Sequence, residues 1–167
     1  MSTLTAATQR RTRNWGPAIM QNYRVDNAAT IYIGAFCGLP GANALTSDRG
    51  YLVEWQNQVS LQWAGIAIAE SATNSLSVDG TVVGDTSASP VVQLAVDCGP
   101  LVLEQYTVTG VSAQTDVWRT SVYGSNDNDL TTTANYTTAI GRVLFWYSST
   151  TCDVLLFGQL GHLLFIN

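Results

Sequence analysis

Short β-branched and aromatic runs, separated by turn residues about every 8–12 residues, are the feature of this sequence that most limits its fold. The clearest runs lie at residues 30–33, 51–55, 61–68, 91–96, 143–147 and 153–157. No segment of helical length keeps a 3.6-residue apolar period, and the best candidate for a short helix is Ala64 to Ala72. The pattern predicts an all-β, compact sandwich or barrel-like domain of short antiparallel strands.

Three segments give more local predictions. The alternation of residues from Val117 to Tyr123 predicts a strand. Thr81 to Val83 lies between Asp-Gly and Gly-Asp pairs, which favours a short hairpin. The polar cluster from Ser125 to Asp129 predicts a turn, because Asn and Asp side chains bond to nearby backbone groups.

The surface of this chain is short of charge. Charged residues make up 11% of its 167 residues, against a usual share of about 25%. There are 20 Thr and no Lys, so all seven cations are Arg. This composition predicts a surface of hydroxyls and amides, much of it covered by a partner. The net charge of −5 argues against nucleic-acid binding, which needs a basic footprint.

Residues 1–18 form a separate zone, which we predict to be an extended N-terminal arm. Arg10, Arg11 and Arg13 are its only charged residues, giving +3 and leaving −8 for residues 19–167. Leaving Trp15 in water beside this basic cluster is unfavourable. We therefore expect the arm to dock on a partner or a neighbouring subunit, with a frayed terminus as the alternative. The arm has no apolar stretch typical of a secretory signal.

Residues 19–167 are predicted to form a single β domain with an apolar C-terminal tail. The tail includes Leu163, Leu164 and Phe165, which would be an exposed patch unless covered. It is expected to be either the last strand of the core or a strand contributed to a neighbouring subunit. No run of 18 apolar residues occurs, so no membrane partner is expected.

The residues that carry common catalytic chemistry are scarce. His162 is the only His, it lies in an apolar segment, and no G-x-S-x-G motif is present. Without Lys there is no phosphate-binding P-loop. Cys37, Cys98 and Cys152 are too widely spaced for a zinc or redox motif and are expected to be buried free thiols. We predict a non-enzymatic protein with no catalytic residues, cofactor or metal.

Two weaker ligand signals remain. Asp127 and Asp129 alternate as Ca²⁺ ligands do, but the rest of a calcium-binding loop is missing, and the turn explains them better. Five Trp and seven Tyr keep carbohydrate binding open, although core and subunit interfaces are the more usual place for aromatic side chains.

A series of short motifs between about residues 23 and 157 resembles, in order and spacing, the small decoration proteins of tailed bacteriophage capsids. These proteins are also called cement or head-stabilising proteins. The motifs are Ile31–Gly34, Gly50–Leu52, Ala64–Ala67, Thr107–Gly110, Asp116–Val117, Ser121–Gly124, Asn126–Asn128, Leu130–Thr131, Ile140–Val143 and Thr151–Leu156. The Arg-rich arm and the apolar tail depart from the family pattern, so the resemblance does not define the mode of attachment.

The resemblance implies a compact, non-catalytic β domain on the capsid exterior of the virion. Its partner would be the major capsid protein, and it would act as a homotrimer that clamps neighbouring capsid subunits. Arg10, Arg11, Arg13 and Trp15 are then candidate contacts with the shell, by paired hydrogen bonds to carboxylates and by a buried aromatic anchor. The alternatives are a head fibre that binds a receptor or glycan, and another structural β protein of the tail or neck.

Overall fold

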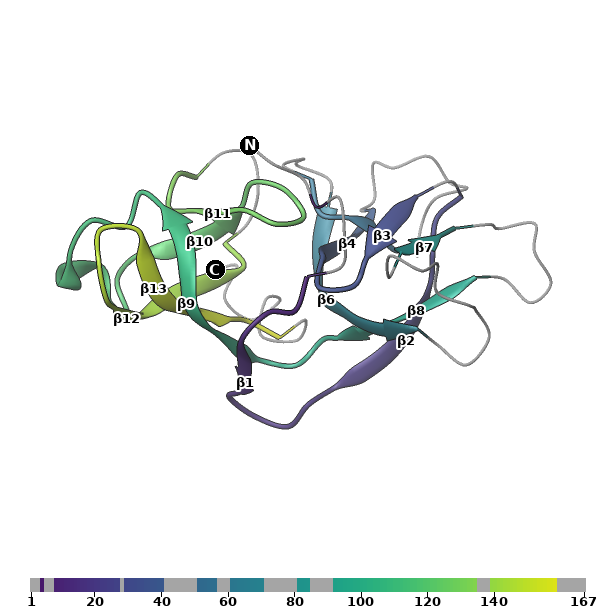
Figure 1. The fold of residues 1–167 in the computed structure, drawn as a ribbon, viewed down its shortest axis with the longest axis horizontal. Helices are drawn as coiled ribbons and strands as arrows, with labels where there is room; N and C mark the ends of the chain where they lie inside the picture. The colour runs from purple at the N-terminus through teal and green to yellow at the C-terminus, as the bar shows by residue number, and fades with distance from the viewer. Residues whose placement is uncertain are drawn as a thin grey trace.

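The computed structural model describes residues 4, 8–27, 29–40, 51–56, 61–70, 81–84, 92–134 and 139–158. Within these residues the regular structure is β-strand, apart from one short 3₁₀ helix, η1 (Gln114–Asp116). The all-β prediction is therefore confirmed. Figure 1 shows the strands gathered into two neighbouring lobes, which we call the sheet lobe and the barrel lobe.

The sheet lobe is built from the first part of the chain. Its five-stranded sheet has the order β2 (Met20–Arg24), β8 (Gln93–Asp97), β6 (Leu61–Glu70), β4 (Phe36–Pro40) and β5 (Val53–Glu54). A separate pair joins β3 (Thr30–Tyr32) to β7 (Thr81–Val83). The prediction of a short hairpin at 81–83 is therefore wrong. β7 pairs instead with β3, about 50 residues earlier in the chain.

The barrel lobe is a closed ring of five strands. In order they are β9 (Leu101–Thr109), β11 (Leu130–Thr131), β10 (Ser121–Gly124), β12 (Gly141–Trp146) and β13 (Thr151–Leu156), and β13 pairs again with β9. Closure removes free sheet edges, which otherwise attract foreign strands. The pairing of β11 with β9 is parallel, and the other pairings are antiparallel as predicted.

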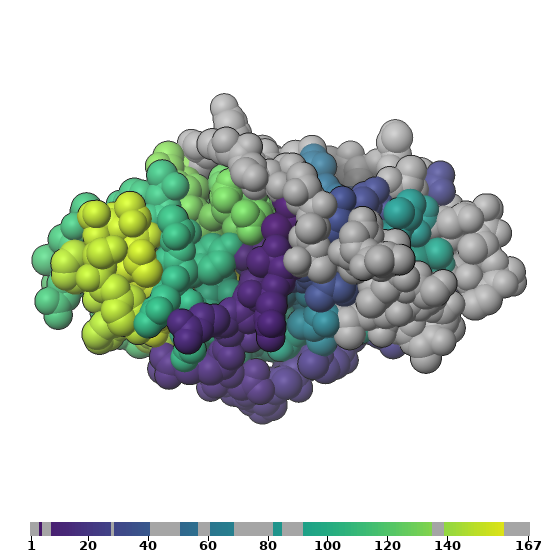
Figure 2. All heavy atoms as spheres, viewed as in Figure 1, coloured from purple at the N-terminus to yellow at the C-terminus, as the bar shows by residue number. Residues whose placement is uncertain are grey.

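A further short strand, β1 (Thr12–Asn14), adds to the outside of this ring. It pairs antiparallel with Leu101–Leu103 of β9, while β11 pairs with the other end of β9, at Val108–Thr109. The predicted arm is thus extended, but part of it is a strand of its own chain's sheet. Figure 2 shows this purple segment lying in the seam between the two lobes.

One hydrophobic cluster spans both lobes. Phe36, Trp55 and Trp63 come from the sheet lobe and pack with buried residues of the barrel lobe such as Leu103 and Leu156. Hydrogen bonds cross the same boundary: Trp55 Nε1 donates to the Gly124 carbonyl at 3.0 Å and Trp63 Nε1 to the Phe157 carbonyl at 2.8 Å. A second cluster lies within the sheet lobe. The lobes therefore share a hydrophobic core.

Two local predictions differ from the structure. Residues 61–70 form the long strand β6, so the candidate helix from Ala64 is wrong; its β-branched Ile residues pack well in a strand. The strand predicted from Val117 begins only at Ser121, because η1 and a turn occupy the residues before it. The turn predicted at 125–129 is confirmed, since Asn126 Oδ1 accepts from the backbone N–H groups of Asn128 and Asp129.

Candidate interaction surface

The basic arm docks on its own chain through backbone and side-chain contacts. The Glu104 N–H donates to the Arg11 carbonyl at 2.9 Å, and the Trp15 N–H to the Pro100 carbonyl at 3.1 Å. Arg13 forms ion pairs with Glu104, at 3.0 Å, and with Asp153, at 3.5 Å. Arg11 is exposed and donates to the Gln105 side chain at 3.2 Å. Of these two predicted shell contacts, Arg13 is thus already paired within the chain.

Arg10 lies deeper, where it bridges the two lobes. Its guanidinium donates to the carbonyl of Gly34 on the sheet lobe and, on the barrel lobe, to the Tyr106 hydroxyl and the Asp127 carbonyl. It also stacks over the Phe36 ring at 4.1 Å. Burial lowers the pKa of Arg10, and interactions with Tyr106 oppose that shift. Arg10 is therefore engaged inside the chain, and the exposed Arg11 is the arginine of the trio best placed for a partner.

The segment Trp15–Met20, which runs from the end of β1 to the first residue of β2, consists of apolar or small residues, and all of them except the half-buried Gly16 are exposed; we call it the apolar loop. Trp15 is 50% exposed, Ile19 41% and Met20 60%. The loop forms the lower rim of the molecule in Figures 1 and 2. A run of this kind, exposed on a folded domain, is typical of an interaction site.

The apolar loop begins at Trp15, which contacts a second exposed tryptophan, Trp118. The two indole rings meet edge to face, with centroids 6.3 Å apart, and Trp118 is 49% exposed. Together they border a groove of about 310 Å³. We call it the tryptophan groove, and its residues are Trp15, Pro100, Trp118, Arg142, Leu155, Phe157 and Gly158.

Asp116 holds the turn that carries Trp118. Its carboxylate accepts from the backbone N–H groups of Ser112, at 2.8 Å, and Ala113, at 3.0 Å, and from the Thr120 hydroxyl at 3.0 Å. These hydrogen bonds, chiefly those from the two backbone N–H groups, hold the pKa of Asp116 below its usual range. Trp118 itself has a φ of 62°, a left-handed conformation that is uncommon for a residue with a bulky side chain.

We expect Asp116→Ala to lower the free energy of unfolding by about 1 kcal/mol at pH 7, the usual effect of removing a helix cap. Because the folded-state pKa is depressed, the carboxylate stabilises the fold above its unfolded pKa of about 3.9, and this stabilisation is lost as the pH falls through the folded pKa. Urea unfolding at pH 7 and at pH 3 measures the difference in the free energy of unfolding between wild type and Asp116→Ala. A difference that is the same at both pH values would contradict this role, and Thr115→Ala is the neighbouring control.

The candidate calcium residues are occupied by other contacts. Asp127 is buried and its carboxylate accepts from the Leu4 N–H at 3.2 Å, while Asp129 accepts from the Asn126 side chain at 2.9 Å. Burial raises the pKa of Asp127. In the part of the chain that the structure describes, no group of three His, Cys, Asp or Glu residues is arranged for a metal ion.

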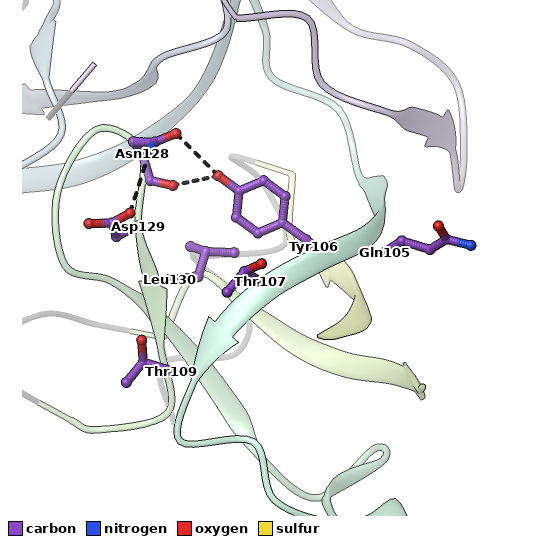
Figure 3. Close-up of a pocket in the computed structure, with 7 residues that line it drawn as sticks. All are labelled: Gln105, Tyr106, Thr107, Thr109, Asn128, Asp129 and Leu130. Atoms are coloured by element: carbon purple, nitrogen blue, oxygen red, sulfur yellow. Dashed lines mark hydrogen bonds between the residues drawn. The ribbon is translucent and has the colours of Figure 1, made fainter. Parts of the chain in front are cut away.

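A separate, polar cavity of about 360 Å³ lies between β9 and the turn before β11. Figure 3 shows Tyr106 pointing at Asn128, to whose backbone carbonyl its hydroxyl donates, with Thr107 and Thr109 along the same side of β9. Hydroxyl, amide and carboxylate groups line this cavity: Gln105, Tyr106, Thr107, Thr109, Asn128, Asp129 and Leu130.

The other predicted residues are placed as follows. Cys37, Cys98 and Cys152 are buried free thiols, as predicted, and burial raises the pKa of Cys152 to about 12. His162 and the tail residues Leu163, Leu164 and Phe165 lie outside the described residues. Among the described residues, no helix is long and apolar enough to cross a membrane.

Neither Trp118 nor Arg142 is predicted as a site residue from the sequence, which places Trp118 in a predicted strand and Arg142 in a motif of the resemblance. The adjacent pair of Trp118 and Arg119 was the available signal. Comparison of the chain with known protein families, with curated proteins and with solved structures finds no match.

Proposed function

We propose that this chain is a structural virion protein that binds the outer surface of an assembled phage capsid and stabilises it by clamping neighbouring major capsid subunits. The order and spacing of the motifs that resemble decoration proteins support this, and so does the all-β fold. A protein that binds the assembled shell but not free subunits stabilises the shell by mass action.

The observation that carries the proposal is the uncovered apolar surface. The apolar loop and Trp118 expose large side chains, whereas Trp55 and Trp63 are fully buried. Aromatic anchors of this kind dominate the energy of protein interfaces. The apolar loop and the tryptophan groove are therefore our candidate for the surface that contacts the shell.

We expect Trp118→Ala to reduce occupancy on capsids that lack this protein by at least about tenfold, the effect of losing one interface anchor. Purified protein is added to such capsids and bound copies are counted by gel densitometry. The matched control is Phe145→Ala: Phe145 is 53% exposed and stacks on Tyr147 near the other end of β12. Unchanged occupancy of the Trp118 variant would remove this surface from the proposal.

The proposed assembly is a homotrimer on the capsid exterior. Light scattering in solution, together with a count of copies at each binding site, tests it, and a monomer under both conditions would contradict it. Labelling of the protein on intact particles tests its location. Signal along the tail rather than over the head would favour another tail or neck protein.

A head fibre that binds a glycan or receptor is the second candidate, and the polar cavity between β9 and β11 favours it. Thr107 and Thr109 supply exposed hydroxyls there, beside the amide of Asn128. A glycan array read with wild type and with Thr109→Val separates the candidates. A sugar signal lost in the variant would support the fibre, whereas a protein that only clamps the shell gives no signal with either.

A further inference from the structure

The tryptophan groove combines aromatic walls with a positive edge. The Arg142 guanidinium lies beside Trp118, where NH1 donates to the Trp118 carbonyl at 3.1 Å. Arg119, which follows Trp118 in the chain, is exposed. The ion pairs found among the described residues all belong to Arg13, so neither Arg119 nor Arg142 has a carboxylate partner there. This is a local excess of positive charge on a chain whose net charge is −5.

Each part of the groove favours one kind of ligand chemistry. Aromatic-lined grooves bind extended segments that carry proline or aliphatic side chains, because such segments lose little entropy on binding. A guanidinium has a planar fork of donors that matches a carboxylate. Arg142 lines the groove and uses one N–H for the Trp118 carbonyl, and its guanidinium has further N–H donors that can bind a ligand.

We propose that the tryptophan groove binds an extended segment of a protein partner in which proline or aliphatic side chains stand next to an Asp or Glu. The proline or aliphatic side chains pack against the contacting rings of Trp15 and Trp118, and the carboxylate pairs with Arg142. This inference rests on the proposed function only for the identity of the partner, which would then be an acidic segment of the shell.

Charge argues against a two-fold dimer of this chain that buries the groove. If two copies met through this face across a two-fold axis, each Arg142 would approach the same groove on the other copy. Like charges brought together at an interface are unfavourable, so the groove selects a partner of opposite charge.

The test begins with selection from a displayed library of random dodecapeptides against the full-length protein. We expect enriched sequences to contain proline or aliphatic residues beside Asp or Glu. Fluorescence polarisation of an enriched peptide should show binding that weakens at least about tenfold with Trp118→Ala, while Phe145→Ala leaves it unchanged. Equal thermal unfolding midpoints for these variants would show that they fold.

A charge reversal tests the role of Arg142 directly. Replacement of the acidic residue of the peptide by Lys should abolish binding to wild type, and Arg142→Glu should restore binding of this Lys peptide. Restoration cannot arise from a purely structural role of Arg142. If the Lys peptide binds wild type with the same affinity as the acidic peptide, the proposal is overturned.

Three further outcomes would overturn the proposal. No enrichment with wild type, but enrichment with the full-length double variant Leu164→Ser and Phe165→Ser, would assign the groove to the C-terminal tail. A change in oligomeric state with Trp118→Ala would assign it to a second copy. No enrichment with any variant would mean that the groove binds no peptide. If the protein binds the peptide but not capsids, the shell is rejected as the partner, and the ligand chemistry proposed for the groove is unaffected.

Discussion

Arg10→Ala should destabilise the protein by about 3 kcal/mol, because it leaves several acceptors without their donor at roughly 1–3 kcal/mol each. The guanidinium donates to Gly34 on the sheet lobe and to Asp127 on the barrel lobe, and it stacks over Phe36. Its removal leaves acceptors of both lobes without their donor in a largely buried site. Chemical denaturation monitored by tryptophan fluorescence measures the loss.

Two substitutions sharpen the interpretation of this experiment. Arg10→Lys keeps the charge but not the planar fork, so we expect it to recover less than half of the lost stability. Arg11→Ala is the matched control, because Arg11 is exposed and its only described side-chain contact is with Gln105; it should change stability by less than about 0.5 kcal/mol. Equal effects at positions 10 and 11 would show that Arg10 does not bridge the lobes.

Trp55→Ala should cost a similar amount, about 3–5 kcal/mol, because it opens a cavity where the lobes meet. Trp55 is 1% exposed, packs edge to face on Trp63 with centroids 5.6 Å apart, and donates to the Gly124 carbonyl. Trp55→Phe keeps most of the volume and loses the hydrogen bond, so about 2 kcal/mol is expected.

Trp118→Ala serves as the comparison for this position, since it removes the same side chain from an exposed site. It should change the free energy of unfolding by no more than about 0.5 kcal/mol. If Trp118→Ala destabilised the protein as much as Trp55→Ala, Trp118 would be a structural residue, and its effect on capsid binding could not be attributed to a lost contact.

The sequence was sufficient to predict the class of fold, because strand patterns and turn residues are local signals. It was not sufficient for the pairing of strands. β7 has the same pattern whether it pairs with a neighbour or with β3, and only packing decides. The alternation from Val117 was misleading for a different reason: side-chain hydrogen bonds of Asp116 impose a turn that residue polarity does not reveal.

The candidate site was predictable only in part. Trp15 was singled out because an indole beside three arginines is costly to leave in water, and the structure places it on an exposed groove. The sequence did not predict which arginine of the arm is engaged inside the chain and which is exposed. Arg10 and Arg11 are adjacent in sequence and alike in type, yet the partners of Arg10 lie 24 to 118 residues away. Contacts at that separation leave no local pattern.

The distance along the chain between β1 and its partner strand has a consequence for synthesis. Strands β2 to β8 lie between residues 20 and 97 and can associate as soon as that stretch has been made, whereas β1 pairs with residues 101–103. At a translation rate of about 5–20 residues per second, several seconds separate the synthesis of the arm from that of its strand partner, and Asn128, a partner of Arg10, is made later still. β1 is thus made well before its partner strand, and it can pair with the start of β9 before β10 to β13, which close the ring, have been made.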